Sequence, residues 1–326
     1  MTGREFILVD EYERRKAALA EIEAPKRSLV AVDIGEFLGM EIPPREMVMG
    51  PIIPSQGLAM IYSKRGVGKT YVALSIAYAV ASGAPFLRWE APKPRRVLFL
   101  DGEMPGAVMQ ERLAQIVKSA NTEPPSPEFL RIITPDLQPE GFPDLAGLEG
   151  QEAVESHLKG VELVVIDNLS TLCRLGRENE SESWGPVQEW ILGLRRRGIS
   201  VLLIHHAGKT GAQRGTSKRE DVLDTVLDLR HPADYGPDEG ARFEVHVEKG
   251  RSIIGEDAKP FEARLEVRDG AAIWTTRDLE DAAFDRVIEL AGDGLTVRDI
   301  ADELGLSKSK VQRLKTRAKA EGRLNG

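Results

Sequence analysis

From Leu58 to His206 the chain repeats one pattern, a short continuous run of apolar residues followed by a segment with helical periodicity. The runs are LAMIY (58–62), RVLFLD (96–101), LRIIT (130–134), ELVVID (162–167) and ISVLLIHH (199–206). Continuous apolar runs indicate strands buried on both faces, as in a parallel sheet. Helices are predicted between them, over 70–82, 105–119 and 184–197. This alternation predicts a doubly wound α/β domain.

The runs after about residue 222 are shorter and alternate between apolar and polar residues. Alternation is typical of antiparallel strands with one solvated face, so we expect such strands at the edge of the sheet. The segments are VLDTVLDLR (222–230), RFEVHVEKG (242–250), FEARLEVRDG (261–270) and AAIWTTRD (271–278). RDGAA at 268–272 predicts a hairpin turn.

Two further segments flank the α/β domain. Residues 5–23 form a predicted amphipathic helix, and the prolines of EIPPRE (41–46) and GPIIPSQG (50–57) predict an extended arm. Residues 280–326 have the pattern of three helices. We therefore expect an N-terminal helix and Pro-rich arm over 1–49, the α/β domain over 50–278 and a small all-helical domain over 279–326.

The charge of the chain is unevenly distributed. Its net charge is −8, but residues 307–326 hold seven basic residues and one acid, so the tail carries +6 and residues 1–306 carry −8 − 6 = −14. A basic tail on an acidic body favours a nucleic-acid partner for the tail.

Other features of the composition bear on the compartment. No stretch approaches 18 uncharged apolar residues, so we expect no membrane span. The first residues lack the basic-then-apolar layout of a secretory signal. The single cysteine, Cys173, cannot form an internal disulfide, which fits a reducing cytosol. A cytoplasmic protein is expected.

The segment MIYSKRGVGKTYVAL (60–74) has the order strand, glycine loop, helix. It fits the phosphate-loop pattern G-x-x-x-x-G-K-[ST] except at Ser63, which stands in the position of the first glycine. A small residue fits there if its φ stays negative, so we expect a working loop. Lys69 can reach the β- and γ-phosphates of ATP, and the Thr70 hydroxyl can bind Mg²⁺. The predicted nucleotide contacts are Ser63, Lys64, Arg65, Gly66, Val67, Gly68, Lys69, Thr70 and Tyr71.

Acidic residues end two of the predicted strands. Asp167 closes ELVVID, as a Walker B aspartate does, and is predicted to hold the water shell of Mg²⁺. VLFLDGEMPG places Asp101 and Glu103 at the same edge of the sheet. Glu103 could activate a water for hydrolysis. Asp101 is the alternative base, and it could instead cap a helix.

His205 and His206 end another predicted strand. Two histidines at this edge could sense the γ-phosphate through hydrogen bonds. Zinc is the alternative, but adjacent side chains diverge and no nearby cysteine or third histidine supports it. The glycine-rich loop that follows is either a contact for a DNA backbone or merely solvated. Its basic residues are Lys209, Arg214, Lys218 and Arg219.

Residues 50–275 resemble the RecA/DnaB-like P-loop ATPases of the AAA family, above all the RepA-type hexameric replicative helicases of plasmids and phages. The resemblance rests on five motifs in the family's order: SKRGVGKT, LDGEMP, VVIDN, LLIHHAGK and RGTS. The resemblance implies a RecA-like fold with a mostly parallel central sheet, and a ring, a hexamer in this family, with ATP between subunits. It favours Glu103 as the base and gives His206 or its neighbour the sensor role. VHVEKGRS places Lys249 and Arg251 at the family's K-x-R finger position, and Arg214 is the other finger candidate. The loop after Asp167, RLGRENESESWG, is more acidic than a DNA-contacting loop should be.

The tail LTVRDIADELGLSKSKVQRLKTRAKAEGRL resembles helix-turn-helix and winged-helix domains. Thr296 and Ser307 are predicted caps, Gly305 permits the turn, and Val311 and Leu314 belong to the buried stripe. The last helix would then read duplex DNA, and a module that docks a partner protein is the alternative. The predicted DNA contacts are Lys308, Lys310, Gln312, Arg313 and Arg317.

Three functions are compatible with these features. The first is an ATP-driven, ring-forming motor that passes a single DNA strand through the ring, a helicase of a plasmid, phage or integrated element. The second is an ATP-switched DNA-binding regulator or recombination ATPase without unwinding activity. The third is a P-loop ATPase that acts away from DNA and docks a protein with its tail.

Overall fold

The computed structural model describes residues 29–174, 181–207 and 221–324. The chain forms two compact units, Met1–Pro44 and Arg45–Gly326. The described part of the first unit contains helix α2 (Ile34–Gly39), which a capping box between Asp33 and Glu36 closes at its N-terminus. The helix predicted over 5–23 lies outside the described residues.

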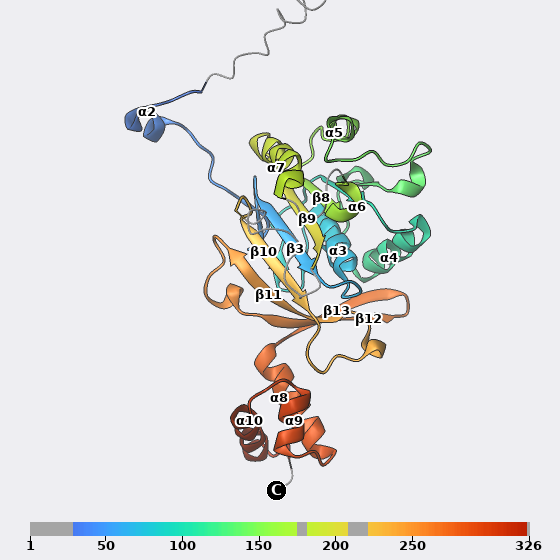
Figure 1. Cartoon of the computed structure of the whole chain (residues 1–326), viewed down its shortest axis with the longest axis vertical. Coiled ribbons are helices and arrows are strands. Elements are labelled where there is room, and N and C mark those ends of the chain that lie inside the picture. The colour runs from blue at the N-terminus through green and yellow to red at the C-terminus, as the bar shows by residue number, and fades with distance from the viewer. Residues whose placement is uncertain (1–28, 175–180, 208–220, 325–326) are drawn as a thin grey trace, which may run out of the picture. The chain divides into compact units, whose positions relative to one another are not determined.

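The second unit is built on a nine-stranded sheet with the order β13-β12-β11-β10-β3-β9-β8-β6-β7 (Figure 1). Neighbouring strands from β10 to β7 are parallel, and those from β10 to β13 are antiparallel. The parallel strands are β10 (Thr225–Arg230), β3 (Leu58–Ser63), β9 (Ser200–His206), β8 (Leu163–Asp167), β6 (Val97–Asp101) and β7 (Leu130–Ile133). The antiparallel strands are β11 (Arg242–Gly250), β12 (Phe261–Arg268) and β13 (Ala271–Asp278). The predicted mixed α/β fold with a mostly parallel sheet is confirmed.

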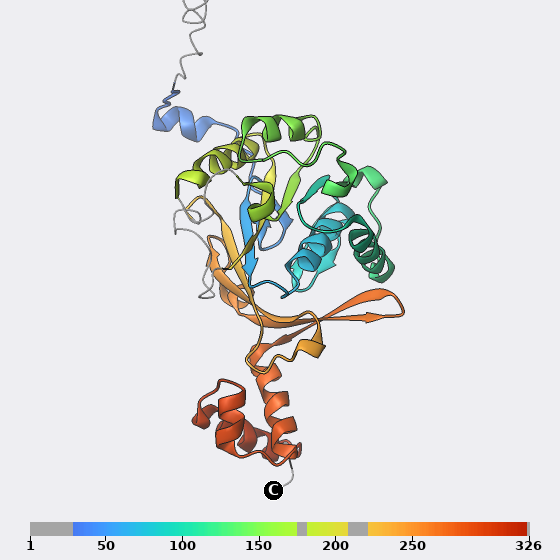
Figure 2. The ribbon, with the colours of Figure 1, turned by 45° about the vertical axis from the view of Figure 1, so that its right-hand side comes forward.

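Helices cover both faces of this sheet (Figure 2). One face packs against α3 (Lys69–Ser82) and α4 (Gly106–Ser119), the other against α5 (Leu148–Glu155), α6 (Leu169–Leu172) and α7 (Ser181–Arg196). Strand β3 shows why its sequence is continuously apolar, because Ala59 and Ile61 enter the first core while Leu58 and Met60 enter the second. The helices predicted over 70–82, 105–119 and 184–197 are confirmed, with small shifts at their ends.

The prediction for the first run after residue 222 is wrong in part. Strand β10 lies inside the sheet, parallel to β3 on one side and antiparallel to β11 on the other. Its apparent alternation comes from two buried acids, since Asp224 pairs with Arg45 at 3.2 Å and Asp228 with Arg230 at 2.6 Å. Paired carboxylates occupy positions that the sequence pattern assigned to a solvated face.

The antiparallel edge itself begins at β11. Its outer strands β12 and β13 form the predicted hairpin, and the turn residues Asp269 and Gly270 both have positive φ, as two-residue turns of this kind require. The hairpin extends beside α4, and the Lys118 ammonium donates a hydrogen bond to the Asp269 carbonyl (Figure 2).

The prediction of an extended arm around residues 50–57 is also wrong. This segment folds with the body as a small hairpin of β1 (Met47–Met49) and β2 (Ile53–Pro54), and its apolar residues, Val48, Met49, Ile52 and Ile53, are buried. Pro51 lies in the turn, where no ladder hydrogen bond is required of it. A second small hairpin pairs β4 (Pro85–Phe86) with β5 (Trp89–Glu90).

The last described residues form three helices, α8 (Leu279–Gly292), α9 (Val297–Glu303) and α10 (Lys308–Ala320), which enclose a core of their own. Thr296 and Ser307 cap α9 and α10 as predicted, by accepting hydrogen bonds from the backbone N–H groups of Asp299 and Lys310. Gly305 has a φ of 61° in the turn between them. Among the helices of the described ranges, none has both the length and the apolar character needed to cross a membrane.

Candidate nucleotide site

A pocket of about 440 Å³ opens where the parallel strands β3, β6, β8 and β9 end. The strand register explains the gathering, because Ser63 is paired with His206 and Asp101 with Asp167 at this edge. Ligand sites in open α/β sheets lie at the carboxyl ends of the strands. The lining residues are Arg65, Gly66, Gly68, Lys69, Thr70, Glu103, Arg112, Asp167, Asn168 and His206.

The loop between β3 and α3 has the conformation that its glycines predict. Gly66 and Gly68 have φ values of 85° and 113°, and Gly68 caps α3. A Cβ added to Gly68 would lie 3.1 Å from the Cβ of Ala241, so both conformation and space require glycine there. Ser63 is the last residue of β3 and its φ is not positive, as we expected for a side chain in this position.

Lys69 is held tightly in this loop. Only 6% of the residue is exposed, and its Nζ donates hydrogen bonds to the Ser63 carbonyl at 3.1 Å, the Ser63 hydroxyl at 3.0 Å and the Lys64 carbonyl at 3.0 Å. Burial lowers the pKa of the Lys69 ammonium to about 8, although the nearby Asp167 and Glu103 carboxylates oppose this. The lysine therefore still carries its charge at neutral pH.

Asp167 and Thr70 form the candidate metal site. Thr70 lies beside Asp167 and lowers the pKa of its carboxyl, but burial is the larger effect and raises that pKa to about 7. The Oδ2 atom of Asp167 is buried and has no hydrogen-bond partner within the described ranges. A hydroxyl and a carboxylate with an unused oxygen are hard ligands that suit Mg²⁺ with its water shell. These residues fit the metal that the sequence predicted.

The two acids at the end of β6 differ in their surroundings. Asp101 is 1% exposed, and its carboxylate accepts hydrogen bonds from the Met104 backbone N–H at 3.1 Å and the Thr134 hydroxyl at 3.2 Å. Asp101 thus closes the turn before α4. The helix cap that the sequence offered for it is wrong, because the N-cap of α4 is Pro105. The Glu103 side chain is 47% exposed and lines the pocket, so its carboxylate is the one that can reach a water there.

His206 also lines the pocket, whereas His205 is fully buried and does not. The His206 Nε2 atom lies 3.8 Å from Oε1 of Glu103, which is beyond hydrogen-bond distance, and neither ring nitrogen has a hydrogen-bond partner among the residues described. Burial, with the nearby Lys69 ammonium, lowers the pKa of His206. The imidazole is therefore neutral at pH 7 and can offer one donor and one acceptor.

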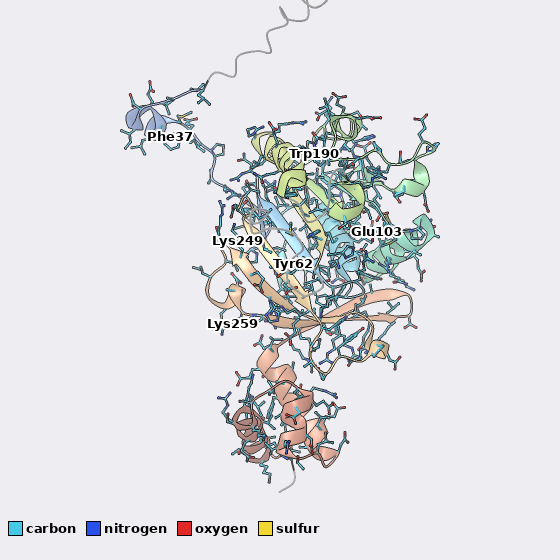
Figure 3. All side chains as sticks on the ribbon, in the orientation of Figure 1. Phe37, Tyr62, Glu103, Trp190, Lys249 and Lys259 are labelled. Atoms are coloured by element: carbon cyan, nitrogen blue, oxygen red, sulfur yellow. The ribbon has the colours of Figure 1, made fainter. Side chains whose placement is uncertain are left out.

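The predicted finger residues lie elsewhere. Thr225 of β10 is opposite both Gly250 and Ala59, so Lys249 and Arg251 are near the start of β3, about 13 Å along the strands from Ser63 at 3.3 Å per residue. Both side chains donate to the Asp221 carbonyl, at 3.4 and 2.9 Å. In Figure 3, Lys249 and Glu103 lie on opposite sides of the body. Lys209, Arg214, Lys218 and Arg219 fall outside the described residues.

Two residues of the pocket were missed from the sequence. Arg112 reaches it from α4, with its guanidinium 5.4 Å from the centre of the Tyr71 ring. No motif distinguished Arg112 from the other polar residues of an amphipathic helix. Asn168 follows Asp167 directly and caps α6. Asn168 could have been predicted from its position directly after the Walker B run.

The predicted DNA contacts of α10 differ in their freedom. Lys308, Gln312 and Arg313 are exposed. Lys310 is half-buried, and the Arg317 guanidinium lies 4.3 Å from the centre of the Phe284 ring while it pairs with Glu321 at 2.7 Å. Arg317 thus packs over an aromatic ring, and Arg313 has no such contact with the residues that the structure describes.

A comparison with protein families agrees with the geometry of the pocket. A family model described as AAA domain matches residues 23–212, which is more than half of the chain and includes every residue that lines the pocket. Strands β10–β13 and helices α8–α10 lie beyond the match. The chain therefore belongs to the AAA domain family of P-loop ATPases.

Proposed function

We propose that this ATPase is a ring-forming DNA motor, a RepA-like replicative helicase of a plasmid, phage or integrated element. One observation carries the proposal. The pocket gathers a phosphate loop, a metal-binding pair, a candidate base and a candidate sensor, while the predicted finger residues lie on β11 and just after it, at the opposite end of the sheet. Such a division suits a site that a neighbouring subunit completes.

Within the pocket each side chain has a distinct task. Lys69 and the backbone N–H groups of the loop bind the phosphates. Thr70 and Asp167 would hold Mg²⁺, which would neutralise charge on the phosphate oxygens. The Glu103 carboxylate accepts a proton from the attacking water. Neutral His206 bonds the γ-phosphate or the water and passes its state to the loop that follows β9.

Lys249 and Arg251 are too far along the sheet to serve their own pocket. In a ring, the edge that carries them faces the pocket of the next subunit, where a cation adds roughly 10³–10⁵ in rate. Arg65 and Arg112, which line the pocket of their own chain, are the alternatives in cis. Variants of each pair separate the two arrangements.

The DNA contacts follow from the charge of the chain. The loop after His206 is rich in glycine and basic residues and would track a single strand, and the exposed basic residues of α10 would contact duplex DNA. The test is ATP-dependent strand displacement by the full chain, with Lys69→Ala as the inactive control. Displacement that persists in the Lys69→Ala variant contradicts the proposal.

One observation favours a second candidate, an ATP-switched DNA-binding regulator that does not unwind. A Cβ on Gly305, in the turn before α10, would lie 3.5 Å from Ala233 of the body, so this turn packs on the loop after β10. A nucleotide could then control how α10 is presented. ATP-dependent DNA binding without strand displacement by the wild type would select this candidate.

A further inference from the structure

Three oxygen atoms surround the Lys69 ammonium, and one of them is a side-chain hydroxyl. Lys69 Nζ lies 3.0 Å from Ser63 Oγ, 3.1 Å from the Ser63 carbonyl and 3.0 Å from the Lys64 carbonyl. An ammonium has three N–H donors, so this set accounts for all of them. Both Lys69 and Ser63 are buried.

Ser63 supplies an acceptor that the usual phosphate-loop sequence lacks. The pattern has glycine in this position, and glycine would leave Lys69 only the two carbonyl acceptors. The Ser63 hydroxyl donates to the Lys64 carbonyl at 2.7 Å while it accepts from Lys69. Register with His206 holds the Ser63 backbone at the end of β3.

A phosphate oxygen that accepts a hydrogen bond from Lys69 has to replace one of these three acceptors. The two carbonyls are part of the loop backbone, whereas the hydroxyl can turn away by rotation about one bond. We infer that Ser63 is a positioning residue whose hydroxyl holds the Lys69 ammonium on the loop in competition with the phosphates, and thereby weakens nucleoside triphosphate binding. This inference rests on the proposed ATPase function of the pocket.

Removal of the hydroxyl then has an unusual consequence. In Ser63→Ala one N–H of the buried ammonium loses its acceptor, and an unmet donor in a buried site is unfavourable. A phosphate oxygen satisfies that donor, so the variant gains more from binding than the wild type does. We expect about a 3- to 10-fold lower Kd for a non-hydrolysable ATP analogue with Mg²⁺.

The experiment measures this Kd by titration calorimetry for the wild type, Ser63→Ala and Ser63→Gly, and steady-state ATP hydrolysis for the same chains. Both variants lack the hydroxyl, but only glycine adds backbone freedom, so agreement between them assigns the effect to the hydroxyl. Ser200→Ala is the matched control, because Ser200 is equally buried on the neighbouring strand β9 and its hydroxyl donates to the Pro54 carbonyl.

The expected result is a lower Kd and a lower KM in both Ser63 variants, with kcat within about 2-fold of the wild type and no change in Ser200→Ala. Loss of packing alone would raise KM or lower kcat. An unchanged or higher Kd in Ser63→Ala and Ser63→Gly overturns the inference while leaving the ATPase function in place. A wild type that binds no nucleotide removes the proposed function and the inference together.

Discussion

The Nε2 atom of His206 lies 3.8 Å from the Oε1 atom of Glu103. The two residues come from the loop after β6 and from the end of β9, with β8 between these strands in the sheet. The candidate base and the candidate sensor are therefore neighbours in the pocket. Among the described residues that line it, the only other acid is the buried Asp167. We expect ATP hydrolysis to depend on Glu103, and the sensing of the γ-phosphate to depend on His206.

Replacing Glu103 by Gln removes the carboxylate and keeps the size of the side chain. We expect kcat for ATP hydrolysis to fall about 10²- to 10⁴-fold, with the Kd for nucleotide changed only a few-fold, because general-base catalysis is lost while binding groups remain. Asp101→Asn is the matched control, since Asp101 holds the turn at Met104 and does not line the pocket. It should lower the melting temperature more than the rate. Hydrolysis that survives in Glu103→Gln would assign the base elsewhere.

Replacing Asp167 by Asn should separate stability from function. Burial raises the pKa of Asp167 from 3.8 to about 7, so between these values the folded chain binds more protons than the unfolded chain. Stability contributed by this group thus falls as pH rises from about 4 to 7, and the cost is complete above pH 7. At pH 8 without nucleotide, Asp167→Asn should be more stable by roughly 1–3 kcal/mol.

The same Asp167→Asn variant should lose Mg²⁺-dependent nucleotide binding. Thermal melts at pH 5 and pH 8 with and without MgATP measure both effects, and the gain in stability should be present at pH 8 and small at pH 5. A variant that is less stable than the wild type at pH 8 would show that Asp167 has a stabilising partner in the folded chain.

His206 should give a pH dependence of the opposite sense. Its pKa is lowered from 6.5 by burial and by the Lys69 ammonium, so the folded chain binds fewer protons than the unfolded chain just below pH 6.5. The stability contributed by neutral His206 is complete above pH 6.5 and falls as the pH drops below it. His206→Gln should therefore lose less stability than the wild type between pH 7 and pH 5, as measured by denaturant melts. It should also slow ATP hydrolysis by about 10-fold or more.

Two arginines of α10 offer a matched pair for DNA binding. Arg313 is exposed and its nearest acid, Glu280, is 3.9 Å away, whereas Arg317 packs over Phe284. Arg313→Ala should weaken duplex binding and lower the slope of log K against log salt by about 1, with an unchanged melting temperature. Arg317→Ala should lower the melting temperature as well. Equal DNA affinity of the wild type and a chain without residues 279–326 would exclude the tail as the DNA-binding part.

Much of the pocket followed from the sequence because its parts are local. Gly66, Gly68 and Lys69 lie within one loop, and the strand ends at Asp167 and His206 are marked by continuous apolar runs. Parallel strands bring such ends together without further information. The preference for Glu103 over Asp101 came from a resemblance. The geometry agrees, because the Asp101 carboxylate accepts a hydrogen bond from the Met104 backbone N–H in the turn.

The errors arose where long-range pairing changes the meaning of a local pattern. Asp224 and Asp228 made β10 appear solvated, although Arg45 and Arg230 neutralise them inside the sheet. The prolines near residue 50 predicted an arm, but Val48 and Ile53 bury a hairpin against the body. Arg112 reaches the pocket because of the way α4 packs on the sheet, and no residue spacing in the sequence predicts that packing.

We propose that Lys249 or Arg251 of a neighbouring subunit completes the pocket around Lys69. Mixing two inactive variants tests it most directly: Lys69→Ala, which keeps the finger, and the double variant Lys249→Ala, Arg251→Ala, which keeps the pocket. We predict that each alone hydrolyses almost no ATP and that an equal mixture recovers up to about a quarter of the wild-type rate, since random assembly forms that share of complete interfaces. A mixture as inactive as its components, or a double variant as fast as the wild type, contradicts the claim.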